Sequence, residues 1–260
     1  MAEPGALPAT LFAPAKVTLS LRVTGVRPDG LHLIDAEIVT VDLADRIRLE
    51  EGDGLALEGP FAAELDGRPV SDNLVMQALH AVGAAGRVRV VIDKQIPTAA
   101  GLGGGSADAA AVLRWVGIDD RQVATDLGAD VAFCAAGGRA QVTGIGDEVV
   151  AAAHRPLTLT LVTPPIAVAT AEVYAAWDAL GGPRVDGPND LEPAALHVEP
   201  QLARWRHQIE EMAGARPALA GSGSTWWLEG DHVPDLAPLQ EEGARLVVAC
   251  QSVPAGWAPG

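Results

Sequence analysis

The stretch Pro97-Thr98-Ala99-Ala100-Gly101-Leu102-Gly103-Gly104-Gly105-Ser106-Ala107 lies between a valine-rich and an alanine-rich segment. The segment before it, 87–92, alternates valines and predicts a strand, and the segment 107–116 predicts a helix. Glycines let backbone N–H groups turn toward one point, and the helix N-terminus adds about half a positive charge. The stretch therefore predicts a loop that binds an anion such as phosphate, with a tight structural turn as the alternative.

Two common glycine-rich loops do not fit this stretch. No Gly-Lys-Ser/Thr closes it, so it is not a P-loop. A Rossmann loop is disfavoured because the run 121–132 holds no strand that ends in a ribose-binding acid.

The charge of the chain restricts its partners. Its 260 residues carry a formal net charge of −16, which disfavours binding to nucleic acid or to an anionic membrane surface. An anionic ligand must then be held locally by N–H groups, a metal ion or a few cations. We therefore expect a small-molecule substrate, with neither nucleic acid nor membrane as a partner.

The two cysteines, Cys134 and Cys250, form no metal-ligand spacing and no disulfide framework. The sequence has no signal-peptide pattern and no apolar run long enough to span a bilayer. These features predict a cytoplasmic setting.

Lysine is scarce in this chain. Of 18 basic side chains only Lys16 and Lys94 are lysines. A position that stays lysine where arginine is otherwise used suggests a need for a compact ammonium, with chance as the alternative.

Strand and helix patterns alternate along the whole chain, which predicts an α+β fold. Asp72 and Asn73 precede an apolar-periodic stretch and predict a capped helix at 74–82. A boundary is expected in 151–156. Further strands are predicted at 15–24, 33–41, 45–49, 157–162, 219–228 and 246–250, and further helices at 122–127, from 128, 171–180, 202–212 and 236–242.

Three segments together resemble the motifs of the GHMP kinase superfamily. They are Pro14-Ala15-Lys16-Val17-Thr18-Leu19, the glycine-rich stretch, and Leu219-Ala220-Gly221-Ser222-Gly223-Ser224. Four shorter segments resemble the branch that phosphorylates a cytidine diphosphate-linked methylerythritol: Asp29-Gly30-Leu31-His32, Asp72-Asn73-Leu74, Leu127-Gly128-Ala129-Asp130-Val131 and Asn189-Asp190-Leu191.

The resemblance implies two domains around a cleft. The N-terminal domain, 1–153, would have the ribosomal-protein-S5-like fold and bind ATP with Mg²⁺, and the C-terminal domain, 154–260, would be a ferredoxin-like α/β sandwich. The γ-phosphoryl group of ATP would move to the 2-hydroxyl of the methylerythritol unit. The alternatives are a homoserine- or mevalonate-type kinase and a nucleotide-binding relative without turnover. The chain would be a monomer or a homodimer.

Asp130 and Lys16 match the superfamily's catalytic pair. Asp130 would accept the proton of the attacking hydroxyl, and Lys16 would keep Asp130 ionised and polarise that hydroxyl. From the residues alone, a helix N-cap is the favoured interpretation of Asp130, and a solvated strand lysine is the alternative for Lys16.

The remaining positions are carried over from the same resemblance. His32, Thr170 and Tyr174 match the cytosine site, where Leu31 replaces an aromatic residue and Thr18 replaces an asparagine. Gly221, Ser222 and Gly223 form the third motif. Ser106 is expected to contact phosphate or Mg²⁺, or to cap the following helix, and Asp108 to compensate the dipole in its first turn. No residues are assigned as metal ligands.

Overall fold

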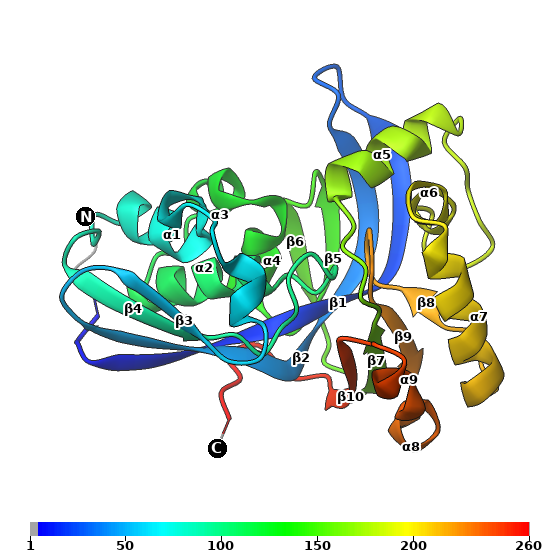
Figure 1. Cartoon of the computed structure of the whole chain (residues 1–260). Helices are drawn as coiled ribbons and strands as arrows, with labels where there is room; N and C mark the ends of the chain where they lie inside the picture. Colours follow the sequence, from blue (N-terminus) through cyan, green and yellow to red (C-terminus); the bar gives the residue numbers. More distant parts are fainter. Residues whose placement is uncertain (1–4, 260) are drawn as a thin grey trace.

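The computed structural model describes residues 5–259, which form two sheets with helices around them. Figure 1 shows an elongated molecule with the first sheet and helices α1 to α4 in one half, and the second sheet and helices α5 to α9 in the other. This mixed α and β architecture confirms the predicted α+β class.

The first sheet is organised by two long strands, β1 (Ala9–Val26) and β2 (His32–Glu51), which form a hairpin. At 20 residues, β2 is long enough to pair β4 (Val88–Asp93) near one end and β5 (Arg139–Gly144) near the other. The path ends at β3 (Leu55–Glu58), parallel to β4, and at β6 (Glu148–Ala152), antiparallel to β5, while β1 pairs only with β2. Strand β2 therefore connects the part of the sheet that precedes the glycine loop to the part beside the turn of the β1–β2 hairpin.

Four helices pack against this sheet (Figure 1). Buried small residues at 107 and 109–111 let the central helix lie close to β1. Asn73 caps the first of these helices as predicted, because its side chain accepts a hydrogen bond of 2.9 Å from the amide of Val75. The four are α1 (Leu74–Ala81), α2 (Gly104–Trp115), α3 (Arg121–Leu127) and α4 (Ala129–Ala136).

The second sheet has the order β10-β7-β9-β8, with every pair antiparallel. Numbered along the chain this is the order 4-1-3-2 of a ferredoxin-like sandwich, as predicted. Its strands are β7 (Thr158–Thr163), β8 (Ala218–Leu219), β9 (Trp226–Glu229) and β10 (Leu246–Gln251). The helices of this half are α5 (Thr170–Ala179), α6 (Glu192–Val198), α7 (Gln201–Ala213), α8 (Val233–Leu236) and α9 (Pro238–Glu241).

The halves are tied together at several points. Leu21 bridges Asn189, and Val41 bridges Ser252. A hydrophobic cluster under the glycine loop combines Val17 and Leu102 with Leu159 of the second sheet. The sheets divide between β6 and β7, but the cores are shared, so the domain boundary at 153/154 stays a prediction.

Several predicted elements differ from the structure. The helix expected from Ala107 begins three residues earlier, because Gly103 adopts a left-handed conformation and serves as its N-cap. The predicted strand 219–228 is two short strands around the third motif, and the predicted helix 236–242 is two short helices separated near Pro238. Strands β3, β5 and β6 and helix α6 were not predicted. Within residues 5–259 no helix is both long and apolar enough to cross a membrane.

Candidate functional site

The three motifs meet although they lie far apart in the sequence. A Cβ atom on Gly101 would collide with the carbonyl oxygen of Ala220 and lie 2.9 Å from that of Gly223. The amide of Thr225 donates a 3.2 Å hydrogen bond to the carbonyl of Ala100. Glycine at 101 therefore permits the loop and the third motif to pack backbone against backbone.

Lys16 from β1 lies at the centre of this arrangement. Its amide donates to the carbonyl of Leu102 at 3.0 Å, and its side chain passes so close to Gly103 that a Cβ there would lie 2.8 Å from Lys16 Cγ. Its Nζ lies 3.2 Å from Asp130 Oδ2 and 3.4 Å from Thr18 Oγ1. The lysine is therefore buried and fixed, not a solvated strand residue.

Asp130 is the second residue of α4, and Gly128 holds the N-cap position. The helix-cap reading of Asp130 is therefore wrong. The Asp130 side chain is 41% exposed against 7% for Lys16, so one partner of this ion pair faces solvent. Its place in the first turn also puts the carboxylate where the helix dipole favours negative charge.

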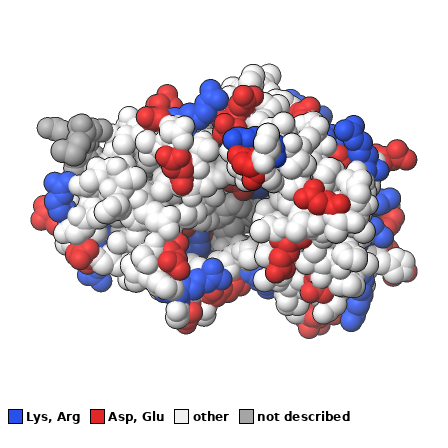
Figure 2. All heavy atoms as spheres, turned by 90° about the horizontal axis from the view of Figure 1, so that it is seen from above, with Lys and Arg blue, Asp and Glu red and all other residues white. Residues whose placement is uncertain are grey.

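Two cavities adjoin at Asp130. The first, here called the loop cavity, has a volume of about 390 Å³ and is lined by the glycine-rich stretch except Leu102 and Ala107, which are buried. The second, the hairpin cavity, has a volume of about 510 Å³ and is lined by residues of the β1–β2 hairpin and α5. Asp130, Gly101 and Thr170 line both cavities. Figure 2 shows a hollow between the two halves of the molecule.

The hairpin cavity contains the predicted base-recognition residues. The His32 ring lies 4.6 Å from that of Tyr174, centroid to centroid, and meets Trp177 edge-on at 5.7 Å. His32 Nε2 lies 2.8 Å from Asp178 Oδ1. An ionised Asp178 carboxylate only accepts hydrogen bonds, so Nε2 carries a proton, and in the neutral tautomer this leaves Nδ1 as an acceptor. Burial raises the pKa of Tyr174, which keeps its hydroxyl protonated.

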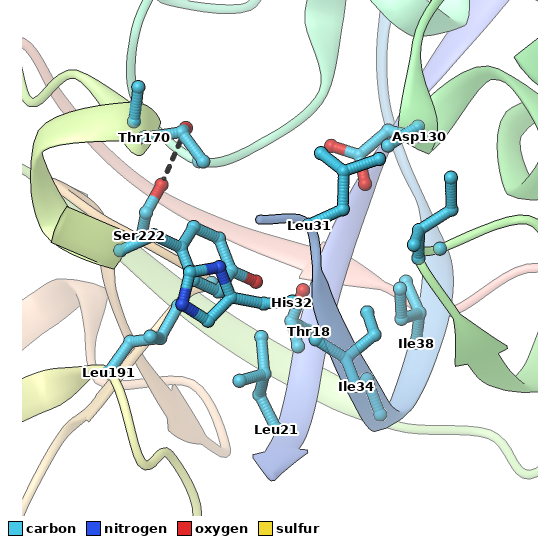
Figure 3. Close-up of a pocket in the computed structure, with 18 of the residues that line it drawn as sticks. Thr18, Leu21, Leu31, His32, Ile34, Ile38, Asp130, Thr170, Leu191 and Ser222 are labelled. Carbon is cyan, nitrogen blue, oxygen red and sulfur yellow. Dashed lines mark hydrogen bonds between the residues drawn. The ribbon is translucent and has the colours of Figure 1, made fainter. Parts of the chain in front are cut away.

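Other predicted residues border the same cavity (Figure 3). Thr18 lies deep in it, and Thr170 Oγ1 is 2.9 Å from Ser222 Oγ, which joins α5 to the third motif. Leu31 is 47% exposed at the hairpin end, where its apolar side chain contributes to the wall. Gly221 lines the cavity close to Lys16 and Thr18, whereas Gly223 packs toward Leu219.

The second lysine has a different environment. Lys94 Nζ contacts the carboxylates of Asp45 and Asp108, the latter at 2.6 Å, and all three side chains are buried. The other oxygen of Asp45 accepts from the amides of Gln95 and Ile96 at 2.5 and 2.9 Å. This cluster joins the chain before the glycine loop to the helix after it.

Asp108 corrects the sequence prediction, because it is a buried partner of Lys94 and not an exposed first-turn residue. Burial raises the pKa of Asp108 to about 8. Burial lowers the pKa of Lys94, but the two carboxylates outweigh it and the net change is a rise. One oxygen of Asp108 has no hydrogen-bond partner in the described part of the chain.

Ser106 is the third residue of α2 and lines the loop cavity. The N-cap position belongs to Gly103, so the reading of Ser106 as a cap is wrong. Its hydroxyl lies in the first helical turn, where an anion is favoured.

A third cavity, of about 210 Å³, opens beside the loop cavity and shares Leu65, Arg68, Asp72 and Asn73 with it. Leu55, Leu57 and Val70 supply its apolar walls. The sequence did not point to Leu55, Leu57 and Val70 as site residues. The alternating leucines of β3 were the available signal, but nothing local showed that they face a cavity.

Comparison with known proteins agrees with this arrangement. Residues 73–153, which include the glycine loop and Asp130, match the family described as GHMP kinases N terminal domain.

Curated relatives match most of the chain. A 4-diphosphocytidyl-2-C-methyl-D-erythritol kinase of Granulibacter bethesdensis is 37% identical over 95% of this chain and 91% of its own. One of Cereibacter sphaeroides is 39% identical over 82% and 86%.

Solved structures give the same result. A crystal structure of 4-(cytidine 5'-diphospho)-2C-methyl-D-erythritol kinase aligns with a TM-score of 0.76 and 31% identity, covering 94% of this chain and all of that one. A mevalonate kinase of Methanococcus jannaschii aligns with a TM-score of 0.59 at 13% identity over 95% and 98%, a likeness of fold alone.

Proposed function

The chain belongs to the 4-diphosphocytidyl-2-C-methyl-D-erythritol kinases of the GHMP superfamily, and on that premise we propose how its residues divide the reaction. It is an ATP-dependent phosphotransferase. Its acceptor is the 2-hydroxyl of 4-diphosphocytidyl-2-C-methyl-D-erythritol. The observation that carries this proposal is Asp130, which lies where the loop and hairpin cavities adjoin and is paired with Lys16.

The loop cavity takes the triphosphate of ATP. Backbone N–H groups of the stretch 97–107 and the N-terminus of α2 supply positive potential, and Arg68 and Lys94 also line this cavity. The apolar third cavity adjoins the loop cavity, so we assign it to adenine.

Asp130 and Lys16 act on the acceptor hydroxyl. The hydroxyl transfers its proton to an Asp130 oxygen while its own oxygen forms a bond to the γ-phosphorus. The bond from that phosphorus to the β–γ bridging oxygen breaks, and ADP leaves with the electron pair. Lys16, held by Thr18 and Gly103, stabilises the charge at the attacking oxygen.

The hairpin cavity takes the cytidine end of the acceptor. Tyr174 and Leu31 provide surfaces for the base, and His32 Nδ1 provides an acceptor for an exocyclic amino group. Thr18, Thr170, Gly221 and Ser222 border the path from the base to Asp130, and Gly223 shapes the turn behind them.

Mg²⁺ would accompany ATP and neutralise charge on the transferring phosphates. Mg²⁺ bound with nucleotides takes only one or two protein oxygens, and the loop cavity offers the Ser106 hydroxyl. The donor set therefore fits this ion. We place the enzyme in the cytoplasm, as a monomer or a homodimer, with Cys134 and Cys250 as buried free thiols.

The test is ADP release measured with three acceptors in parallel. The cytidine substrate should support turnover, whereas homoserine and mevalonate should not. Turnover of homoserine or mevalonate without the cytidine substrate would contradict the acceptor assignment. No turnover by the folded wild type with any of the three would contradict the assignment as an active kinase.

A further inference from the structure

Glu64, in the short 3-10 helix η1 (Ala62–Leu65), joins three distant segments of the chain. One of its oxygens accepts from the Thr98 amide at 2.8 Å and from the Thr98 hydroxyl at 2.9 Å. Arg245, just before β10, donates Nε to the other oxygen at 2.9 Å and Nη2 to the first at 2.5 Å. The geometry is that of a bidentate ion pair.

Arg245 also holds Thr98 directly. Its Nη2 donates to the Thr98 carbonyl oxygen at 2.8 Å. The N–H, hydroxyl and C=O groups of Thr98 are thus all engaged by one ion pair. Glu64 belongs to the N-terminal half and Arg245 to the C-terminal half, so the contact fixes the start of the glycine loop against both.

The next residue is held in a strained conformation. Ala99 has φ +49°, and among the described residues it is the only non-glycine with positive φ. A residue other than glycine in the left-handed region costs about 1–2 kcal/mol and persists when its surroundings impose it. The peptide between Thr98 and Ala99 is the one that the Arg245 guanidinium holds.

Thr98 and Ala99 line the loop cavity, whereas Glu64 and Arg245 do not. The ion pair therefore acts on a ligand in that cavity only through the backbone. Burial opposes the ionisation of Glu64, but the hydrogen bonds from Thr98 and Arg245 outweigh it and lower its pKa.

From these contacts we propose that Glu64 and Arg245 are positioning residues for the phosphate donor. They hold the Thr98–Ala99 peptide in the conformation that binds the triphosphate. The inference rests on the proposed function only in that the ligand of the loop cavity is ATP. It predicts that breaking the pair weakens nucleotide binding and leaves acceptor binding unchanged.

Glu64→Gln is the decisive variant because the direction of its effect on nucleotide affinity separates the two explanations. Removing a negative charge near an anionic ligand should by itself tighten binding. Loss of the contacts that the Glu64–Arg245 ion pair makes with Thr98 should instead raise the Kd of a non-hydrolysable ATP analogue about tenfold, as measured by calorimetry. The KM for the cytidine acceptor should stay within about twofold.

Rescue separates positioning from general destabilisation. Ala99→Gly removes the conformational penalty at that position, so it should recover part of the lost affinity in the Glu64→Gln protein. Arg245→Met should weaken nucleotide binding similarly, and the Glu64→Gln, Arg245→Met double variant should be no worse than either single one. Arg155→Met, which breaks the exposed Arg155–Glu229 pair, is the matched control and should leave the Kd unchanged.

Unchanged or tighter nucleotide binding in Glu64→Gln, or no recovery with Ala99→Gly, would overturn the inference. The binding measurement is independent of turnover. A wild type that binds the analogue but does not phosphorylate the cytidine acceptor would sink the proposed function and leave this inference standing. A wild type that binds no analogue contradicts both.

Discussion

The two lysines of this chain have similar burial but different partners. Lys16 pairs with a half-exposed carboxylate between two cavities, whereas Lys94 contacts two carboxylates that are themselves buried. An ion pair with one face open to a cavity can exchange a proton with a ligand. Lys94 and Asp108 line the loop cavity, but their charged groups are engaged with each other and with Asp45, so this cluster holds the backbone around it. The scarcity of lysine identified both positions, but the exposure of the partners separates their roles.

The largest expected effect is at the Lys16–Asp130 pair, here called the open pair. Asp130→Asn removes the proton acceptor and should lower kcat by about 10²–10⁴-fold. The Kd of an ATP analogue should change little, because the loop that binds it is intact. Wild-type kcat in this variant would show that Asp130 is not the base.

Lys16→Arg keeps the charge but not the shape. The Lys16 stem packs against Gly103, so a longer, planar guanidinium on the same stem would place its charge away from the position of Nζ and from the reacting oxygen. A displacement of about 1 Å can cost about 100-fold in rate, and we expect a fall in kcat of that order. Turnover close to wild type would sink the assignment of Lys16.

Substitution in the cluster of Lys94, Asp45 and Asp108 should lower the free energy of unfolding. Lys94→Met leaves the buried Asp45 carboxylate without its cation and Asp108 without its hydrogen-bond donor, and should cost about 3–5 kcal/mol of unfolding free energy. Denaturant unfolding measures this. Lys16→Met is the matched control, with an expected cost of about 1 kcal/mol because Asp130 remains solvated. Equal costs at the two lysines would remove the distinction.

The smallest effect concerns pH. The pKa of Asp108 rises from 3.8 to about 8 on folding, so between these values the folded state binds more protons than the unfolded state. This group therefore makes stability fall as pH rises through that window, by at most about 1.4 kcal/mol per pH unit. Asp108→Asn should reduce that slope in unfolding measured at pH 5 to 8. An unchanged slope would show that Asp108 is ionised in the fold.

The features that depend on neighbouring residues in the sequence could be predicted. The glycine stretch and the Asn73 cap were predictable because the residues that form each lie within a few positions. The pairing of Lys16 with Asp130 was expected only through the resemblance, since they are 114 positions apart. The dipole role expected of Asp108 and the helix-cap alternative for Ser106 were wrong because helix α2 begins three residues earlier than its alanines suggest.

Other features had no sequence signal. The partners of Lys94, the Glu64–Arg245 clamp and the apolar third cavity depend on long-range packing. Glu64 and Arg245 are 181 positions apart, and they lie beside the first and the second sheet respectively. Their charges are ordinary in the sequence, and only the fold shows that they meet at Thr98.

The most direct test of Asp130 as the base for phosphoryl transfer is a single-turnover reaction with γ-labelled ATP and 4-diphosphocytidyl-2-C-methyl-D-erythritol. The wild type should place the label on the 2-hydroxyl oxygen of the methylerythritol unit, and Asp130→Asn should bind the nucleotide but place almost none. Label at another hydroxyl, or transfer at the wild-type rate by Asp130→Asn, would contradict it.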